Sequence, residues 1–310
     1  MNLYYYNFKD TYMKKGFPAE TNVDQLLRLY AEGKRDFPNI NLKKTYLAET
    51  KLPGVNLRGA NLKKAILSET NLEGADLRGA NLEGAQLIGT ELCRANLQAA
   101  NLKQADLREV RNLNMADMLA ADLQGANLES TNLEGTNLPE VNLTQARLKA
   151  SRLFAADLSS AEIQNADFQS AIYNEKTRFP EGFDPISAGM YLIAPKVSIL
   201  EANLENVLLF DVDLREANFT ASNLTEANLV KANLQGATLK GVCLNGADLF
   251  QTNLSNADLT GADLSFTRLN EAIIFDTKFQ DACYSRLTRF PQGFDPVSAG
   301  MRWVDVDNDN

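Results

Sequence analysis

The chain has 310 residues, of which 45% are hydrophobic and 23% charged, and its formal net charge is −9. An acidic chain opposes the phosphate neutralisation on which nucleic-acid binding depends, so direct binding to nucleic acid is not expected. The sequence has no histidine, which excludes Ser-His-Asp and Cys-His catalysis and histidine-bound metal sites, and no cofactor is expected.

Neither a membrane span nor a secretory signal is expected. No run of about 18 consecutive apolar residues occurs, and the first residues are aromatic and charged rather than apolar. The three cysteines (Cys93, Cys243 and Cys283) are odd in number and far apart, which is typical of free thiols in a reducing compartment. We therefore expect a cytoplasmic protein that does not bind membranes.

Residues 1–36 are predicted to form an N-terminal extension that ends in a short helix. The run from Thr21 to Gly33 begins with two residues suited to the N-cap, places apolar side chains on one face and stops at glycine. A short amphipathic helix before a repeat body is expected to cap the open core of the first repeat.

Leucine then recurs at every fifth position through most of the chain. The repeat runs from Phe37 to Leu107, from Leu113 to Tyr173 and from Ile199 to Tyr284, and Leu occupies 36 of its 46 positions. A period of five fits neither an α-helix nor a β-strand, and self-similarity at fixed spacing is typical of solenoids. If each Leu (position i) and the small residue at i−2 point inward, four units close a coil of 20 residues whose interior is filled.

Units such as Gly79 to Glu83 (GANLE) and Gly261 to Ser265 (GADLS) follow the pattern A(D/N)LxG in tandem. This pattern resembles the pentapeptide-repeat family, in particular its cyanobacterial members, over about three-quarters of the chain. The resemblance implies an all-β solenoid, a right-handed quadrilateral β-helix. It does not imply one function, because members of the family differ widely in what they do.

Two interruptions organise the repeat. An extra residue among Arg108–Asn112 predicts a bulge or small loop, and the phrase TRFPxGFDPxSAGM occurs twice, from Thr177 and from Thr288. Each copy follows bulkier residues at the repeat position and is predicted to cap a core. Residues 174–198, which interrupt the repeat, either separate two β-helices or loop out of one continuous rod, and we favour two stacked blocks. The expected segments are 1–36 (extension and capping helix), 37–173 (first block), 174–198 (cap-like linker), 199–286 (second block) and 287–310 (C-terminal cap and tail).

In such a coil, residues 20 apart lie on the same wall, so the sequence predicts which side chains are neighbours on the surface. Four outward apolar residues share one wall of the second block: Leu208, Phe210, Val230 and Phe250. An exposed apolar patch generally marks an interface. The alternative is that an internal segment, residues 191–200 or 4–8, folds over this wall.

A basic column is predicted on one wall of the first block. Its members are Lys43, Lys44, Lys63 and Lys64. Such a column suits an acidic partner, but Glu83 interrupts it, and we favour an ordinary solvated face.

The sequence favours a non-enzymatic scaffold or regulator that binds a partner protein on the outer faces of a rigid β-helix. A DNA mimic that binds gyrase or topoisomerase, as some family members do, is the alternative. Residues 199–310 carry 8 Lys and Arg against 16 Asp and Glu. Their net charge of −8 over roughly 22 Å of coils falls short of the approximately 13 charges on DNA of that length. The partner and the oligomeric state are not predicted.

Overall fold

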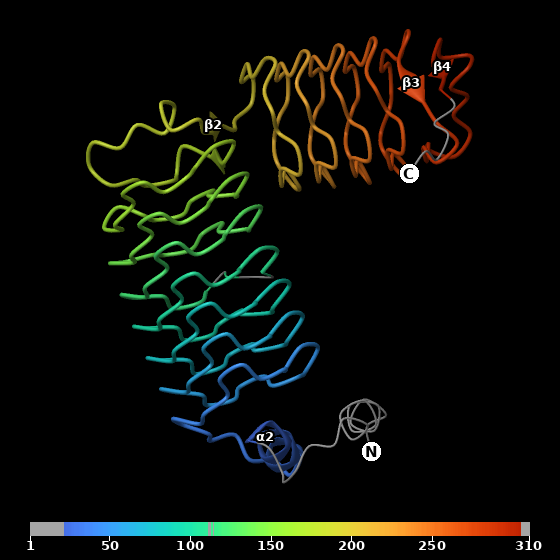
Figure 1. Ribbon diagram of the computed structural model, residues 1–310. Coiled ribbons are helices and arrows are strands. Elements are labelled where there is room, and N and C mark those ends of the chain that lie inside the picture. Colours follow the sequence, from blue (N-terminus) through green and yellow to red (C-terminus); the bar gives the residue numbers. More distant parts are fainter. Residues whose placement is uncertain (1–21, 111–112, 114, 305–310) are drawn as a thin grey trace.

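The chain forms two coiled blocks that meet at an elbow (Figure 1). The computed structural model describes residues 22–110, 113 and 115–304. Helix α2 (Asn22–Ala31) precedes the first block, and parallel pairs of two-residue strands, β1 with β2 and β3 with β4, end the two blocks. The strands are β1 (Ile172–Tyr173), β2 (Tyr191–Leu192), β3 (Cys283–Tyr284) and β4 (Arg302–Trp303).

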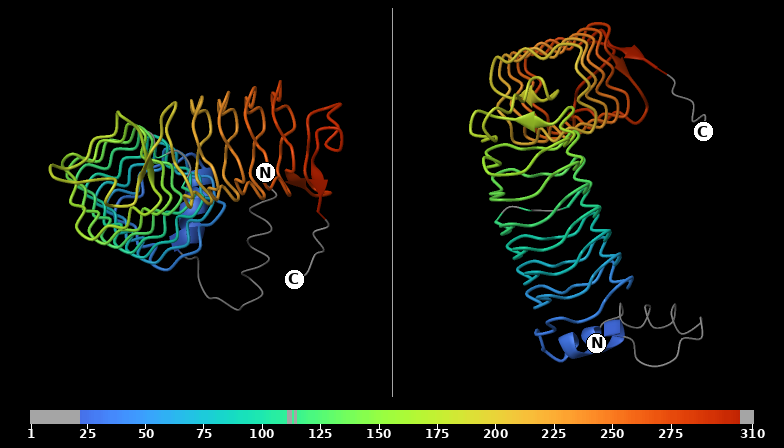
Figure 2. Two further views of the ribbon diagram at one scale, coloured as in Figure 1. Left: turned by 90° about the horizontal axis from the view of Figure 1, so that it is seen from above. Right: turned by 60° about the vertical axis from the view of Figure 1, so that its left-hand side comes forward.

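Each regular coil takes 20 residues, or four five-residue sides. Parallel bridges join residues 20 apart, as between Asn61 and Asn81 and between Asn81 and Asn101. The amide of Leu62 donates to the carbonyl of Asn81 at 2.7 Å, and equivalent amides repeat this bond from coil to coil. The fold is therefore a repeat β-helix stabilised by hydrogen bonds between successive coils. Seen along its axis, the second block has a closed, roughly square outline (Figure 2).

Tight turns between the sides explain which residues surround each leucine. The amide of Ala60 donates to the carbonyl of Leu57 at 2.9 Å, and Gly59 between them has a φ of 66°. Glycine suits this left-handed backbone, so it is frequent at position i+2. The side-chain oxygen of Asn56 accepts a hydrogen bond from the amide of Arg58 at 3.1 Å, which favours Asn or Asp at position i−1.

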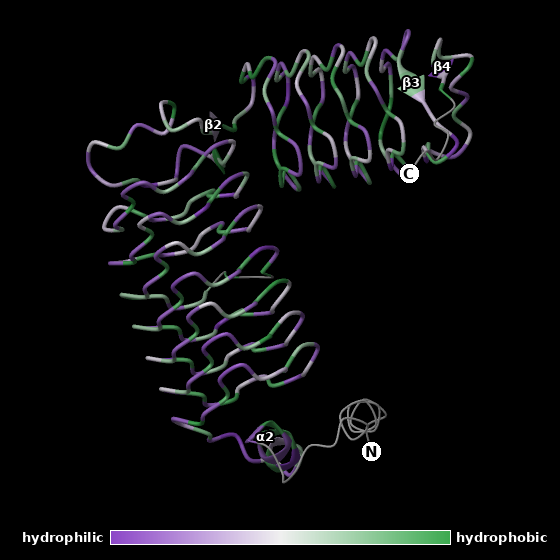
Figure 3. Cartoon of the chain, viewed as in Figure 1, coloured by the Kyte–Doolittle hydropathy of each residue, from purple (hydrophilic) through white to green (hydrophobic). Residues whose placement is uncertain are grey.

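Leucine and small residues fill the interior of both blocks. Leu82 and Ala80 are representative, because each has an exposed fraction of 0%. Hydrophobic and hydrophilic residues consequently alternate along the coils (Figure 3). Several buried threonine hydroxyls bond to the backbone of the preceding coil, as where Thr70 donates to the carbonyl of Leu47 at 2.8 Å. The interior is therefore a packed core rather than a channel.

One extra residue lengthens a coil in the middle of the first block. Bridged partners lie 21 residues apart between Asn96 and Asp117, and they are 20 apart again between Asp122 and Asn142. The bulge predicted among Arg108–Asn112 falls in this longer coil and lies partly outside the described residues.

Each block ends in the same aromatic arrangement. The ring centroids of Phe168 and Phe183 lie 5.3 Å apart, and those of Phe279 and Phe294 lie 5.2 Å apart. Phe183 and Phe294 come from the two TRFPxGFDPxSAGM segments, and each packs against the core of its own block. The aromatic rings therefore cover the apolar end of the last coil, which would otherwise face water.

Helix α2 lies at the opposite end of the first block. Leu26 is fully buried in the same cluster as Leu42 of the first coil. The helix ends where Gly33 takes a φ of 95° and the amide of Lys34 bonds to the carbonyl of Leu29 at 3.0 Å. The helix thus covers the open start of the core.

The two blocks have separate cores and do not stack into one rod. Figures 1 and 2 show the axis turning between them, around residues 174–198. The apolar cluster of the second block includes Phe154 and Ile172 from the last coils of the first block and Ile193 from the linker. The wall of the first block therefore covers the open first coil of the second. The expectation of end-to-end stacking is wrong for this reason.

Candidate protein-interaction surface

Function must lie on the outer walls and at the elbow, because the coils are packed inside. No group of His, Cys, Asp or Glu among the described residues could hold a metal ion. In the same part of the chain, no helix is long and apolar enough to cross a membrane. Cys93, Cys243 and Cys283 are free thiols at partly exposed positions.

The four outward apolar residues predicted from the sequence stack on one wall, here called the apolar wall (Leu208, Phe210, Val230 and Phe250). The amide of Asp211 donates to the carbonyl of Val230 at 2.9 Å, and the amide of Lys231 donates to that of Phe250 at 2.9 Å. These two bonds hold successive members of the wall one coil apart. All four side chains are half-buried.

Arginine side chains stack on both phenylalanines of the apolar wall. The guanidinium of Arg152 lies 4.2 Å from the ring centroid of Phe210, and that of Arg268 lies 4.3 Å from Phe250. Arg268 belongs to the same wall, and it is also paired with Asp248 at 3.1 Å. Val230 lies between the two covered rings, at the centre of the wall, and is partly exposed.

Arg152 links the two blocks at the elbow. Its Nη1 donates to the carbonyls of Leu208 at 3.0 Å and Phe210 at 2.9 Å, both in the second block. Its Nη2 pairs with Glu134 at 2.8 Å, and only 4% of the side chain is exposed. Phe154 lies on the other face of the guanidinium, with its ring centroid 4.3 Å away.

Burial lowers the pKa of Arg152, and the neighbouring carboxylate of Glu134 partly opposes that shift. A buried guanidinium is costly unless it is paired and hydrogen-bonded, and here both conditions are met. Arg152 thus covers the ring of Phe210. Residues 4–8, one of the two segments that could fold over this wall, lie outside the described residues.

The basic column of the first block is partly neutralised. Asn41 and Asn61 are bridged, which brings Lys43 and Lys63 to the same wall. Lys63 pairs with Glu83 at 2.8 Å, and this hydrogen bond lowers the pKa of that carboxyl. Lys43, Lys44 and Lys64 remain exposed around the pair.

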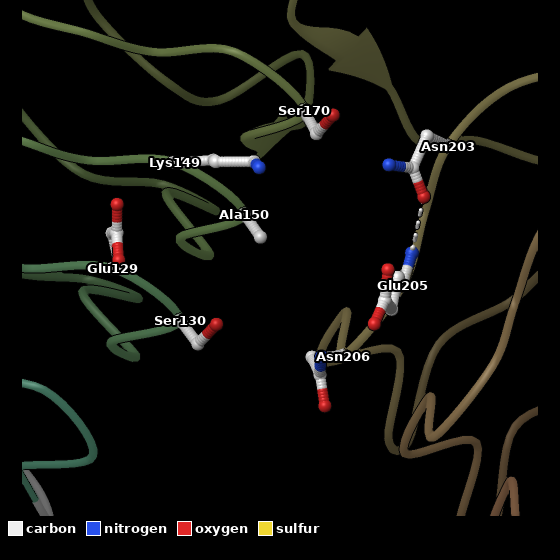
Figure 4. Close-up of a pocket in the computed structure, with 8 residues that line it drawn as sticks. All are labelled: Glu129, Ser130, Lys149, Ala150, Ser170, Asn203, Glu205 and Asn206. Atoms are coloured by element: carbon white, nitrogen blue, oxygen red, sulfur yellow. Dashed lines mark hydrogen bonds between the residues drawn. The ribbon is translucent and has the colours of Figure 1, made fainter.

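A polar groove of about 190 Å³ lies between the two blocks (Figure 4). Lys149 and Ser170 line it from the first block, and Asn203 and Glu205 line it from the second. These residues are far apart in sequence, and only the bend at the elbow brings them together.

The sequence-based prediction missed both elbow features. Arg152 and Phe154 flank the repeat residue Leu153, where Asn or Asp and a polar residue are usual. This double departure from the pattern is the signal that could have identified the contact. No comparable signal marks Lys149 or Asn203, because each fits the ordinary pattern of its own block.

A protein-family model and several solved structures match the repeats of the chain. The model of the pentapeptide-repeat family (eight repeat copies) matches residues 40–79, 75–111, 116–153, 140–172, 202–241, 213–251 and 243–281. No curated protein sequence matches the chain.

Among solved structures, the chain is similar to HetL, a pentapeptide repeat protein involved in heterocyst differentiation regulation in Nostoc sp. strain PCC 7120. The identity is 31%, covering 85% of this chain and 97% of HetL, with a TM-score of 0.31. Another match, alr5209 from the same cyanobacterium, is 26% identical over 55% of this chain and 94% of its own, with a TM-score of 0.18. QnrB1, a plasmid-mediated fluoroquinolone resistance protein, is 13% identical over 87% of this chain and 92% of its own, with a TM-score of 0.22.

Proposed function

The chain belongs to the pentapeptide-repeat family, and we propose that it is a non-enzymatic scaffold or regulator that binds a partner protein on its outer walls. Members of this family are generally structural or interaction proteins rather than enzymes. We also infer the finer features that the family resemblance implies: right-handed quadrilateral winding and a cytoplasmic location. Residues 37–173 and 199–286 are taken as two repeat domains joined by the linker 174–198, and residues 1–36 and 287–310 as the terminal capping segments.

The apolar wall is the observation that carries this proposal. Val230 is a partly exposed aliphatic residue at an outward position, where Gln235 and Thr225 on the adjoining sides are polar. The stacked apolar side chains of a rigid wall are already ordered in the folded protein. Binding of a partner to them therefore loses little further conformational entropy. Arg268 beside the wall is 42% exposed and adds donors of the kind that are enriched at protein interfaces.

The DNA-mimic alternative has less support. Mimicry requires a dense array of unpaired carboxylates, and several carboxylates of the second block are paired with basic residues. Asp213 pairs with Arg215 at 2.7 Å, and Asp248 pairs with Arg268 at 3.1 Å. The net charge density of this block is therefore lower than its count of acidic residues suggests.

Site-specific photo-cross-linking in native lysate tests the proposal. A cross-linking amino acid is introduced at position 230 on the apolar wall or, as a matched control, at Gln235 on the next wall. We expect position 230 to capture a defined protein that position 235 does not capture. Equal capture from both positions, or none from position 230, would contradict binding on the apolar wall.

A further inference from the structure

The groove between the blocks gathers hydrogen-bond donors that no part of the described structure uses. Lys149 is exposed and makes no ion pair with any described residue, and the hydroxyl of Ser170 has no hydrogen-bond partner among them. In Figure 4 the ammonium of Lys149 and the amide nitrogen of Asn203 point toward each other across the groove, with Ser170 beside the gap. The two blocks thus place three donors along the lining of one groove.

The orientation of Asn203 is fixed by its own hydrogen bonds. Its side-chain oxygen accepts from the amide of Glu205 at 3.3 Å and from the side chain of Asn223 at 3.1 Å. With the oxygen occupied twice, the amide NH₂ is the group left to face the groove. A donor held in this way is preorganised for an acceptor, because its direction is set before any ligand arrives.

The charges of the groove limit which acceptor fits. Glu129 is neutralised by Arg147, whose Nη2 lies 2.6 Å from its Oε1. This leaves one unpaired cation, Lys149, and one unpaired carboxylate, Glu205, at the other end of the groove. Lys149 balances the single negative charge of a carboxylate, whereas a phosphate group with a charge of about −1.5 to −2 keeps an excess negative charge that Glu205 repels.

We propose that this groove binds one carboxylate group, with Lys149, Ser170 and Asn203 as its donors. The carboxylate belongs to a small free acid or to the acidic side chain of a peptide, and both present the same planar pair of oxygens. Because first-block and second-block residues bind the same group, its affinity depends on an intact elbow. This site is separate from the apolar wall.

NMR titration of the isotope-labelled full-length protein tests the proposal with acetate, at constant ionic strength set by sodium chloride. We expect saturable shifts of the Asn203 side-chain NH₂ and of the Lys149 Cε–H signals. Lys149→Met should weaken binding about tenfold, as expected for the loss of one charge-assisted bond. Lys278→Met is the matched control, because Lys278 is also exposed but lies far from the groove, and it should bind acetate like the native protein.

Two further ligands, an acidic peptide and inorganic phosphate, distinguish the source of the carboxylate and the class of anion that the groove binds. A blocked Ala-Glu-Ala peptide that binds more tightly than acetate identifies an acidic peptide as the ligand, and one that binds no more tightly identifies a small free acid. Inorganic phosphate should bind more weakly than acetate. Tighter binding of phosphate, shifts that do not saturate, or an unchanged affinity in Lys149→Met would overturn the proposal.

Discussion

Arg152→Met is the most informative test of how the elbow is held. The substitution keeps an unbranched side chain but removes the guanidinium that lies over the rings of Phe154 and Phe210, in a side chain that is only 4% exposed. Two carbonyls in the second block lose their donor, at 3.0 and 2.9 Å. Each hydrogen bond from a charged donor contributes about 1.5 kcal/mol at the lower end of its range, so the contact between blocks weakens by about 3 kcal/mol.

We expect the weaker contact between the blocks to be measurable in the first coil of the second block. Its core is covered by Phe154 and Ile172 of the first block, so a looser elbow exposes it to solvent. The amides of Leu204 and Leu209 donate to the next coil at 2.8 and 2.7 Å, and their exchange measures opening of this coil. A loss of about 3 kcal/mol corresponds to roughly hundredfold faster hydrogen exchange.

Arg268→Met is the matched control for this experiment. Arg268 also stacks on a phenylalanine and pairs with an aspartate, but both partners lie within the second block and 42% of its side chain is exposed. Its loss should cost at most about 1 kcal/mol. Exchange in Arg152→Met that stays within a few fold of the native rate, or that matches Arg268→Met, would refute the role assigned to Arg152.

Three further substitutions test the turns and the C-terminal cap. Residues 221 and 241 stack in successive coils and have left-handed φ values of 57° and 60°. Ala221→Gly should therefore raise the free energy of unfolding by about 1 kcal/mol, and Gly241→Ala should lower it by about as much. Denaturant unfolding measures both changes, and two changes of the same sign would contradict the turn geometry. In the cap, hydrogen bonds from Ser298 and from the amide of Val297 lower the pKa of Asp295. That stabilisation is complete above the ordinary Asp pKa of about 3.9 and is lost as pH falls through the lower value of the folded state. Asp295→Asn should therefore lower the Tm at neutral pH but not at the acid end of a pH series, and a Tm difference that does not depend on pH would argue against this bond.

The sequence predicts the β-helix well because its determinants are local and repeated. Each buried leucine, each small residue at i−2 and each Asn or Asp at i−1 meets the same need in every coil, as Leu82, Ala80 and Asn81 do. The doubled TRFPxGFDPxSAGM phrase likewise predicts where aromatic residues gather, because Phe183 and Phe294 follow the same local arrangement.

The elbow could not be predicted in this way, because it depends on contacts between distant residues. Arg152 bonds to Leu208, 56 positions further along the chain, and nothing in the five-residue period specifies that pairing. The axis turns because outward residues such as Phe154 cover the first coil of the next block. The polar groove depends on that turn in the same way, since Lys149 and Asn203 meet only across it.

The affinity of a partner captured at position 230, measured for two single substitutions on adjacent walls, tests the proposed function most directly. Val230→Asp places a charge at the accessible centre of the apolar wall, and Gln235→Asp adds the same charge to the next wall. We expect Val230→Asp to weaken binding at least about tenfold, as for the loss of a buried apolar contact, and Gln235→Asp to leave it unchanged. Equal affinities for the two variants would contradict the assignment of the apolar wall as the binding surface.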